Sequence, residues 1–94
     1  MYRADFSAIF ARDRKRCRKK HWDMDALAEA LRVVVMSDDE RIPAAYNDHA
    51  LNGEMKGYRE LHVGGRSSNW VVVYMVDGDT VVFTRTGTHD EVFK

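Results

Sequence analysis

Four histidines are the residues of this chain best suited to catalysis: His21, His49, His62 and His89. An imidazole changes its charge near neutral pH, so it can take up a proton in one step and return it in the next. His21 lies between two predicted helices, where capping or solvation explains it. The other three come from separate parts of the second half of the chain, and they can meet on one surface of a sheet.

Two such imidazoles and an arginine could deprotonate a nucleophile, protonate a leaving group and stabilise a phosphorane-like charge. Each histidine taken alone could instead be an unrelated surface residue. A metal site is a further alternative, but the three are widely separated and no close pair of His, Cys or Asp adds ligands. We therefore favour acid–base chemistry and predict no metal and no other cofactor.

The ending TRTGTHDEVFK places Arg85 and His89 on either side of a Thr-Gly-Thr segment. Chain ends usually fray, so an arginine, a glycine and a histidine at these positions need an explanation. We predict that residues 86–88 turn the chain and bring His89 towards Arg85. Val92 and Phe93 would then anchor the end.

A dense basic run, RDRKRCRKK, holds seven of the fifteen Lys and Arg residues and a single acid. The chain as a whole has no net charge, but a local run still sets a local field. Like charges at i,i+4 repel each other, which favours a bound partner over a merely solvated helix face. We predict contact with RNA or with an acidic protein segment through Arg12, Arg14, Lys15, Arg16, Arg18, Lys19 and Lys20.

The composition predicts a single soluble domain spanning residues 1–94, with 45% hydrophobic and 32% charged residues. No apolar run approaches the roughly 18–20 residues that a membrane span requires, and the first residues lack the layout of a signal peptide. A single cysteine, Cys17, excludes an internal disulfide and fits the reducing cytoplasm.

Hydrophobic periodicity predicts helices first and strands afterwards. One helix runs from Phe6 to about His21, and a second follows Asp23, a suitable N-cap, and ends near Ser37. The β-rich runs are residues 57–63, 70–76 and 80–85, with a hairpin turn at 77–79 and a further short strand at residues 1–5. This order predicts an α+β fold in which an N-terminal helical hairpin packs on one face of a small antiparallel sheet.

Strand parity predicts which side chains share a face. Val81 and Phe83 should face the helices. Arg85 has the same parity, so its side chain should lie on that face too, just beyond the end of the core. Arg59 likewise shares parity with Leu61, whereas Tyr58, Glu60 and His62 lie on the opposite face. Two arginines at the ends of apolar faces favour a cleft.

The segments DHALNGEMKGYRELHV, NW and RTGTHDEVF, taken in this order, resemble the YafQ family of bacterial type II toxins, within the RelE-like superfamily. Weaker similarity through KKHWDMDAL and IPAAYNDH extends the match over most of the chain. The resemblance implies a RelE/ParE-like fold and a ribosome-dependent mRNA endonuclease that cuts the A-site codon through attack of the ribose 2′-hydroxyl, without a metal. It also implies a cognate antitoxin, the ribosome and mRNA as partners, DNA contact only through the antitoxin, and no membrane.

By position, the resemblance implies that His89 is the general acid and that Arg85 stabilises the phosphate in the transition state. His49 and His62 would assist deprotonation or hold the phosphate, and Trp70 would position or stack a base. Arg59 is a further candidate for substrate binding.

Asn69 departs from the family, which usually has an acidic residue before the tryptophan, and the loop GGRSSN is longer than the family's link. An amide can hydrogen-bond but has no useful basicity. We hypothesise that His62 or His49 takes the role of the base and that Arg66 adds a phosphate contact. The competing possibility is a slower enzyme.

Two other function classes remain open. A ParE-like toxin would act on a topoisomerase without cutting RNA, and it would not need three histidines with Arg85. A non-catalytic module that binds RNA or protein would leave the histidines incidental.

Overall fold

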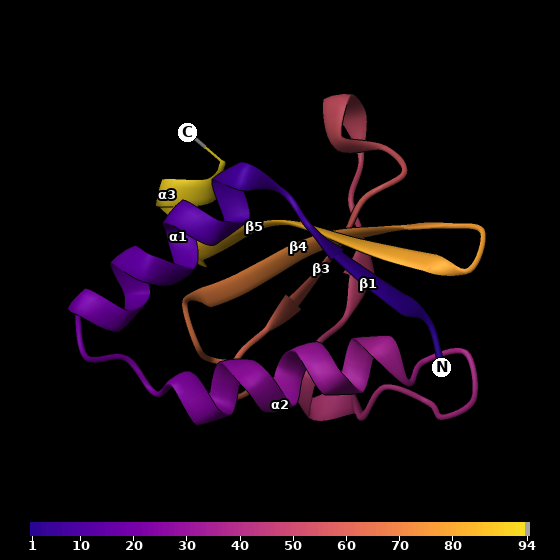
Figure 1. Ribbon diagram of the computed structural model, residues 1–94, viewed down its shortest axis with the longest axis horizontal. Helices are drawn as coiled ribbons and strands as arrows, with labels where there is room; N and C mark the ends of the chain where they lie inside the picture. Colours follow the sequence, from indigo (N-terminus) through magenta and orange to yellow (C-terminus); the bar gives the residue numbers. More distant parts are fainter. Residues whose placement is uncertain (94) are drawn as a thin grey trace.

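The computed structural model describes residues 1–93, which form an α+β fold with three α-helices and a five-stranded sheet (Figure 1). Lys94 lies outside the described residues. The elements are β1 (Arg3–Phe6), α1 (Ala8–Lys19), α2 (Met24–Val35), β2 (His49–Ala50), β3 (Arg59–His62), β4 (Trp70–Asp77), β5 (Thr80–Thr88) and α3 (His89–Val92), with 3-10 turns at Ala44–Tyr46 and Gly53–Met55. The predicted fold class, both long helices and the three main strands are confirmed.

The sheet has the strand order β1-β5-β4-β3-β2. Neighbouring strands are antiparallel except for β1 and β5, which are parallel over Arg3–Phe6 and Thr80–Phe83. The short strand expected at the start of the chain is therefore confirmed, but an all-antiparallel sheet was wrong at this pair. The strand β2 was not predicted, because a two-residue strand leaves no periodic pattern.

Side-chain caps set the starts of both long helices. Ser7 caps α1 by accepting from the Phe10 amide at 2.9 Å, and Asp23 caps α2 by accepting from the Ala26 amide at 3.0 Å. The helix α1 starts later than predicted because Phe6 pairs with Phe83 in the sheet. The turn between the helices places His21 at a positive φ of 60°. None of the described helices is long and apolar enough to cross a membrane.

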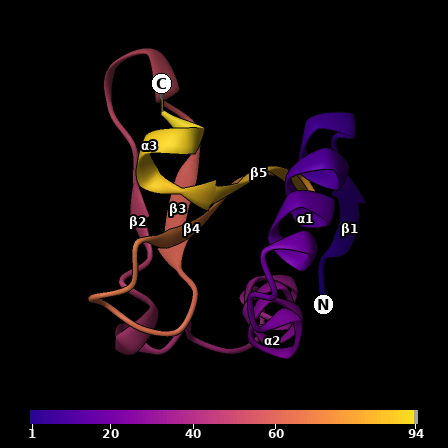
Figure 2. The same cartoon turned by 90° about the vertical axis from the view of Figure 1, so that its left-hand side faces the viewer.

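Apolar side chains form a core on each face of the sheet. The helices α1 and α2 lie on the side of the larger core, and the short helix α3 lies on the side of the smaller one (Figure 2). The larger core contains Phe10, Leu27, Ala30, Val34, Leu61, Val63, Val72, Tyr74, Val81 and Phe83. The smaller core contains Val71, Val73 and Val92, with Leu51, Met55, Tyr58 and Phe93 packed around it.

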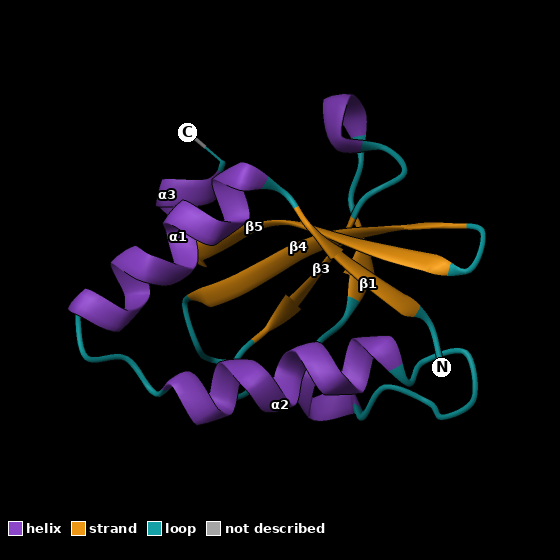
Figure 3. Ribbon diagram, viewed as in Figure 1, coloured by secondary structure: helices purple, strands orange, loops and turns teal. Residues whose placement is uncertain are grey.

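A β-bulge in β5 reverses the predicted orientation of Arg85. Phe83 pairs with Tyr74 and Arg85 pairs with Val73, so Thr84 is an extra residue on β5. After the bulge Arg85 lies on the same face as Val73, which α3 covers. Parity had predicted the opposite face, on which Phe83 packs against α1 and α2. The turn expected at residues 86–88 is also absent, because β5 continues to Thr88 and α3 follows directly (Figure 3).

Candidate active site

Three histidines and one buried glutamate meet on the α3 face of the sheet. Glu60 of β3 is 2% exposed, and its carboxylate oxygens lie 3.5 Å from the Nε2 atoms of His49, His62 and His89. His49 comes from β2, His62 from β3 and His89 from the first position of α3. The convergence predicted for these three histidines is therefore seen, and Glu60 is the group that joins them.

The hydrogen bonds of two histidines fix which nitrogen carries a proton. The Nδ1 atoms of His49 and His62 lie 2.7 Å from the carbonyl oxygens of Asn47 and Ser68. A carbonyl only accepts, so each Nδ1 must donate, and the Nε2 atom is left to face Glu60. Nε2 can bond an ionised carboxylate only when it also carries a proton. The Nε2 atoms of His49 and His62 are therefore the nitrogens available for proton transfer, and both face the buried carboxylate of Glu60.

The members of the cluster differ in exposure, so that some lie deep and others lie at the surface. The side chain of His62 is 15% exposed and lies deep beside Glu60, whereas the side chains of His49 and His89 are 45% and 53% exposed. A ligand approaching the cluster therefore meets His49 and His89 first. The arrangement offers two accessible proton-transfer groups with a charged carboxylate between them.

A capping box, backbone hydrogen bonds and an aromatic contact fix the position of His89. Thr88 and Glu91 form a capping box, in which Thr88 Oγ1 accepts from the Glu91 amide and Glu91 Oε1 accepts from the Thr88 amide at 2.8 Å. The His89 amide donates to the backbone oxygen of Asn69 at 3.1 Å and lies 3.3 Å from its Oδ1. Asn69 therefore supports the backbone of the histidine. The Phe93 ring packs against the imidazole, with the ring centres 4.6 Å apart.

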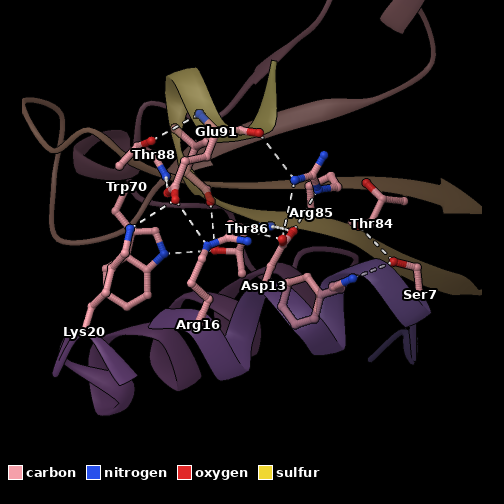
Figure 4. A network of polar contacts seen from close by, with 12 residues as sticks. Ser7, Asp13, Arg16, Lys20, Trp70, Thr84, Arg85, Thr86, Thr88 and Glu91 are labelled. Atoms are coloured by element: carbon pink, nitrogen blue, oxygen red, sulfur yellow. Dashed lines mark hydrogen bonds and ion pairs between the residues drawn. The ribbon is translucent and has the colours of Figure 1, made fainter. Parts of the chain in front are cut away.

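Ion pairs with Glu91 hold α3 against α1 (Figure 4). Glu91 Oε2 lies 3.2 Å from Arg16 Nε and 3.0 Å from Lys20 Nζ. Gly87 makes this close approach sterically feasible: its φ is 151°, and an added Cβ would lie 3.0 Å from an Arg16 nitrogen and 3.1 Å from Glu91 Oε1. The bond from the Thr88 amide, aided by Lys20, lowers the pKa of Glu91 to about 2.

Replacing Glu91 by glutamine should cost roughly 1 kcal/mol of folding stability at pH 7, since the amide keeps the capping-box acceptor but loses the charge for Arg16 and Lys20. The folded pKa lies below the ordinary value of 4.5, so the charge stabilises the fold above that pH and ceases to do so as the pH falls towards 2. Urea unfolding of the wild type and Glu91→Gln should therefore differ at pH 7 and nearly coincide at pH 2.5. The exposed neighbour provides the control: Asp90→Asn should match the wild type within roughly 0.5 kcal/mol at pH 7. An equal gap between Glu91→Gln and the wild type at both pH values would refute this role for the charge.

Arg85 is held by Asp13 of α1 (Figure 4). Asp13 is 2% exposed and accepts from Arg85 Nε at 2.8 Å and from the Thr86 amide at 3.1 Å. A further Arg85 nitrogen lies 3.4 Å from the Glu91 carbonyl. Val73 of β4 lies between Arg85 of β5 and Glu60 of β3 in the sheet. The Cα atoms of Arg85 and Glu60 are therefore separated by two strand spacings, or about 10 Å. A shared phosphate contact for Arg85 and His89 remains a prediction.

Trp70 lies on the helix-facing side of the sheet, apart from the histidines. Its indole donates to Thr86 Oγ1 at 2.9 Å and packs against Trp22 with ring centres 4.9 Å apart. It also lines a hollow of about 420 Å³ beside α2. The role predicted for Trp70, to position or stack a base, remains a prediction.

Arg59 and Arg66 also lie away from the cluster. The parity expected for Arg59 is confirmed, since Leu61 on the same face packs into the larger core. Arg59 and Arg66 line a second hollow on that side of the sheet. Trp70, Arg59 and Arg66 thus lie on one face of the sheet, and the three histidines lie on the other.

The basic run of α1 is only partly free for a partner. Arg16 and Lys20 pair with Glu91, and Arg14 lies over the rings of Phe6 and Phe10. Four residues of the basic run are exposed and form no ion pair among residues 1–93. They are Arg12, Lys15, Arg18 and Lys19. These four are the better candidates for an external anion.

Sequence reasoning missed three carboxylates of this site: Glu60, Asp13 and Glu91. A signal for Glu60 was present, because its parity matches that of His62 and a glutamate on a face shared with a histidine is a candidate partner. Asp13 and Glu91 gave no such signal. Asp13 is the single acid within the basic run, and two of its partners, Arg85 and Thr86, lie more than 70 residues away in the sequence.

Comparison with known proteins places this geometry among bacterial toxins. A family model described as a bacterial toxin of a type II toxin–antitoxin system, YafQ, matches residues 2–94. The mRNA interferase toxin YafQ of Escherichia coli K12 is 35% identical over 89 residues, which make up 95% of this chain and 92% of that protein.

Solved structures agree with the sequence comparison. The toxin fold of the Escherichia coli DinJ–YafQ toxin–antitoxin complex matches with a TM-score of 0.85 and 33% identity over the whole of both chains. A metal-bound toxin from Helicobacter pylori matches with a TM-score of 0.85 and 26% identity over 99% of this chain and 100% of that one. Within residues 1–93 of the present chain, no group of three or more His, Cys, Asp or Glu side chains is arranged to hold a metal ion.

Proposed function

The chain belongs to the YafQ family of type II toxins, and from this premise we propose that it is an mRNA interferase that cuts mRNA in the ribosomal A site and so stops translation. It acts in the cytoplasm, where ribosomes and mRNA meet. The observation that carries the proposal is the contact of His49, His62 and His89 with one buried carboxylate, Glu60. A binding module would have no need of three imidazoles around a buried charge.

The two exposed histidines take the two proton transfers. His49 accepts the proton of the ribose 2′-hydroxyl while the 2′-oxygen forms a bond to phosphorus. The bond from phosphorus to the 5′-oxygen breaks, and His89 donates a proton to that oxygen. The products are a 2′,3′-cyclic phosphate and a free 5′-hydroxyl. Glu60, beneath them, provides a carboxylate 3.5 Å from both imidazoles as the protons move.

The partners are a cognate antitoxin, the ribosome and its mRNA, with DNA contacted only through the antitoxin. The YafQ of Escherichia coli has been solved with the antitoxin DinJ. On the present chain, the exposed run residues Arg12, Lys15, Arg18 and Lys19 suit either acidic antitoxin side chains or ribosomal RNA phosphates.

Adding the protein to a cell-free bacterial translation system and mapping mRNA ends tests the function. We expect cuts in phase with the codons, and we expect His89→Ala to reduce them by about 10²-fold to 10⁴-fold, the usual contribution of one acid–base group. DNA damage without mRNA cuts would instead indicate a topoisomerase poison. If neither effect occurs, the chain is a binding module and the proposal is wrong.

A further inference from the structure

A large hollow lies on the face of the sheet opposite the histidines. Its volume is about 900 Å³, within the range of sites that bind small ligands. Three arginines from three different segments line it: Arg41 after α2, Arg59 of β3, and Arg66 in the loop between β3 and β4. None of these arginines belongs to the basic run of α1.

Among the described residues, Asp48 is the single acid that lines the hollow, and its carboxylate is already paired. Asp48 Oδ2 accepts from Arg59 at 2.7 Å and 3.2 Å, and Asp48 Oδ1 accepts from the Tyr74 hydroxyl. Burial, and then this bond to Asp48, raise the pKa of Tyr74, so its hydroxyl stays protonated and donates. Arg41 and Arg66 are exposed and form no ion pair with any residue in the described range 1–93. The hollow therefore carries an excess of positive charge and suits an anion with several oxygens.

The hollow and the histidine cluster are joined around one edge of the sheet. Arg59 and Glu60 are consecutive in β3, so their side chains point to opposite faces. Asp48, which lines the hollow, directly precedes His49 of the cluster. The edge strand between them, β2, has only two residues. A flexible chain leaving the histidines can therefore pass over β2 and reach the arginines.

We propose that this hollow binds the phosphodiester backbone of single-stranded RNA next to the cleaved nucleotide, an inference that rests on the proposed nuclease function. A guanidinium group can bind two phosphate oxygens at once, and those of Arg41 and Arg66 can hold a backbone without reading its sequence. The continuity with the histidines favours RNA over an acidic protein segment. Arg66 thus keeps the phosphate contact predicted for it, on the far side of the sheet edge.

Binding of a fluorescent 2′-O-methyl RNA oligonucleotide tests the proposal. This RNA cannot be cut, because its 2′-oxygen is blocked. The double variant Arg41→Gln/Arg66→Gln should weaken binding by roughly 10-fold at low salt. It should also reduce the slope of log affinity against log salt by about 1.4, which corresponds to two lost phosphate contacts on a single strand. The control Arg3→Gln/Arg32→Gln, with the same charge change on exposed arginines outside the hollow, should bind like the wild type.

Equal RNA affinity and salt slope in the wild type and the hollow variant would overturn the proposal, as would an equal loss in the control. A fluorescent polyglutamate peptide distinguishes the other ligand class: loss of peptide binding with RNA binding intact would assign the hollow to an acidic protein and also overturn it. The RNA assay needs no catalysis. A protein that binds RNA through Arg41 and Arg66 but cuts no mRNA would refute the nuclease function and leave the RNA site standing.

Discussion

Replacing Glu60 by glutamine is expected to slow mRNA cleavage by about 10²-fold to 10³-fold while the protein stays folded. Glutamine has nearly the shape of glutamate but no charge. Glu60 is 2% exposed and lies 3.5 Å from three imidazoles, so its charge balances each proton that the cluster gains. An amide cannot do this, and a proton taken by His49 would then have no counter-charge in a site that is partly shielded from water.

The measurement is the single-turnover rate of mRNA cleavage on programmed ribosomes, with the melting temperature recorded for each variant. Glu54→Gln is the matched control, because Glu54 is exposed in the 3-10 turn Gly53–Met55 and forms no ion pair among the described residues. The control should cleave at the wild-type rate. A Glu60→Gln protein that folds and cleaves like the control would show that the carboxylate has no part in the chemistry.

Replacing Asp13 by asparagine should destabilise the fold by about 3 kcal/mol, the usual loss when one partner of a buried ion pair is removed. Asp13 is 2% exposed and holds Arg85, Arg16 and the Thr86 amide together. An asparagine leaves Arg85 without a counter-charge and turns an amide donor towards groups that are themselves donors. For a domain of this size, the melting temperature should fall by roughly 12–24 °C.

Thermal unfolding followed by circular dichroism checks this expectation. Asp5→Asn is the control, since Asp5 is exposed on β1 and forms no ion pair with another described residue. It should melt within a few degrees of the wild type. A loss below about 1 kcal/mol in Asp13→Asn would mean that the network in Figure 4 contributes little to stability.

The features that the sequence predicted were those with local causes. The second helix followed from apolar spacing and from Asp23, whose side chain does cap it, and the hairpin followed from Asp77-Gly78-Asp79 between two Val-rich runs. The meeting of three histidines was predictable because they lie in segments that a small sheet must bring together. Glu60 could have been added, since strand parity already placed it beside His62.

The features that escaped prediction depend on tertiary contacts. Parity gave Arg85 the wrong face because nothing in TVVFTRTGT marks the bulge at Thr84. The parallel pairing of β1 and β5 joins residues nearly 80 positions apart. The role of Gly87 becomes visible only when Arg16 and Glu91 are seen to crowd it. Contacts such as these have no signature in local spacing.

The central claim is that Glu60 and His89 act as one catalytic unit, and a double-mutant comparison tests it most directly. Single-turnover mRNA cleavage would be measured for the wild type, Glu60→Gln, His89→Ala and the double variant. Residues that act as a unit are far from additive, so the double variant should be no more than about threefold slower than the slower single variant. A double variant whose loss equals the product of the two single losses would contradict the claim, because the two residues would then act independently.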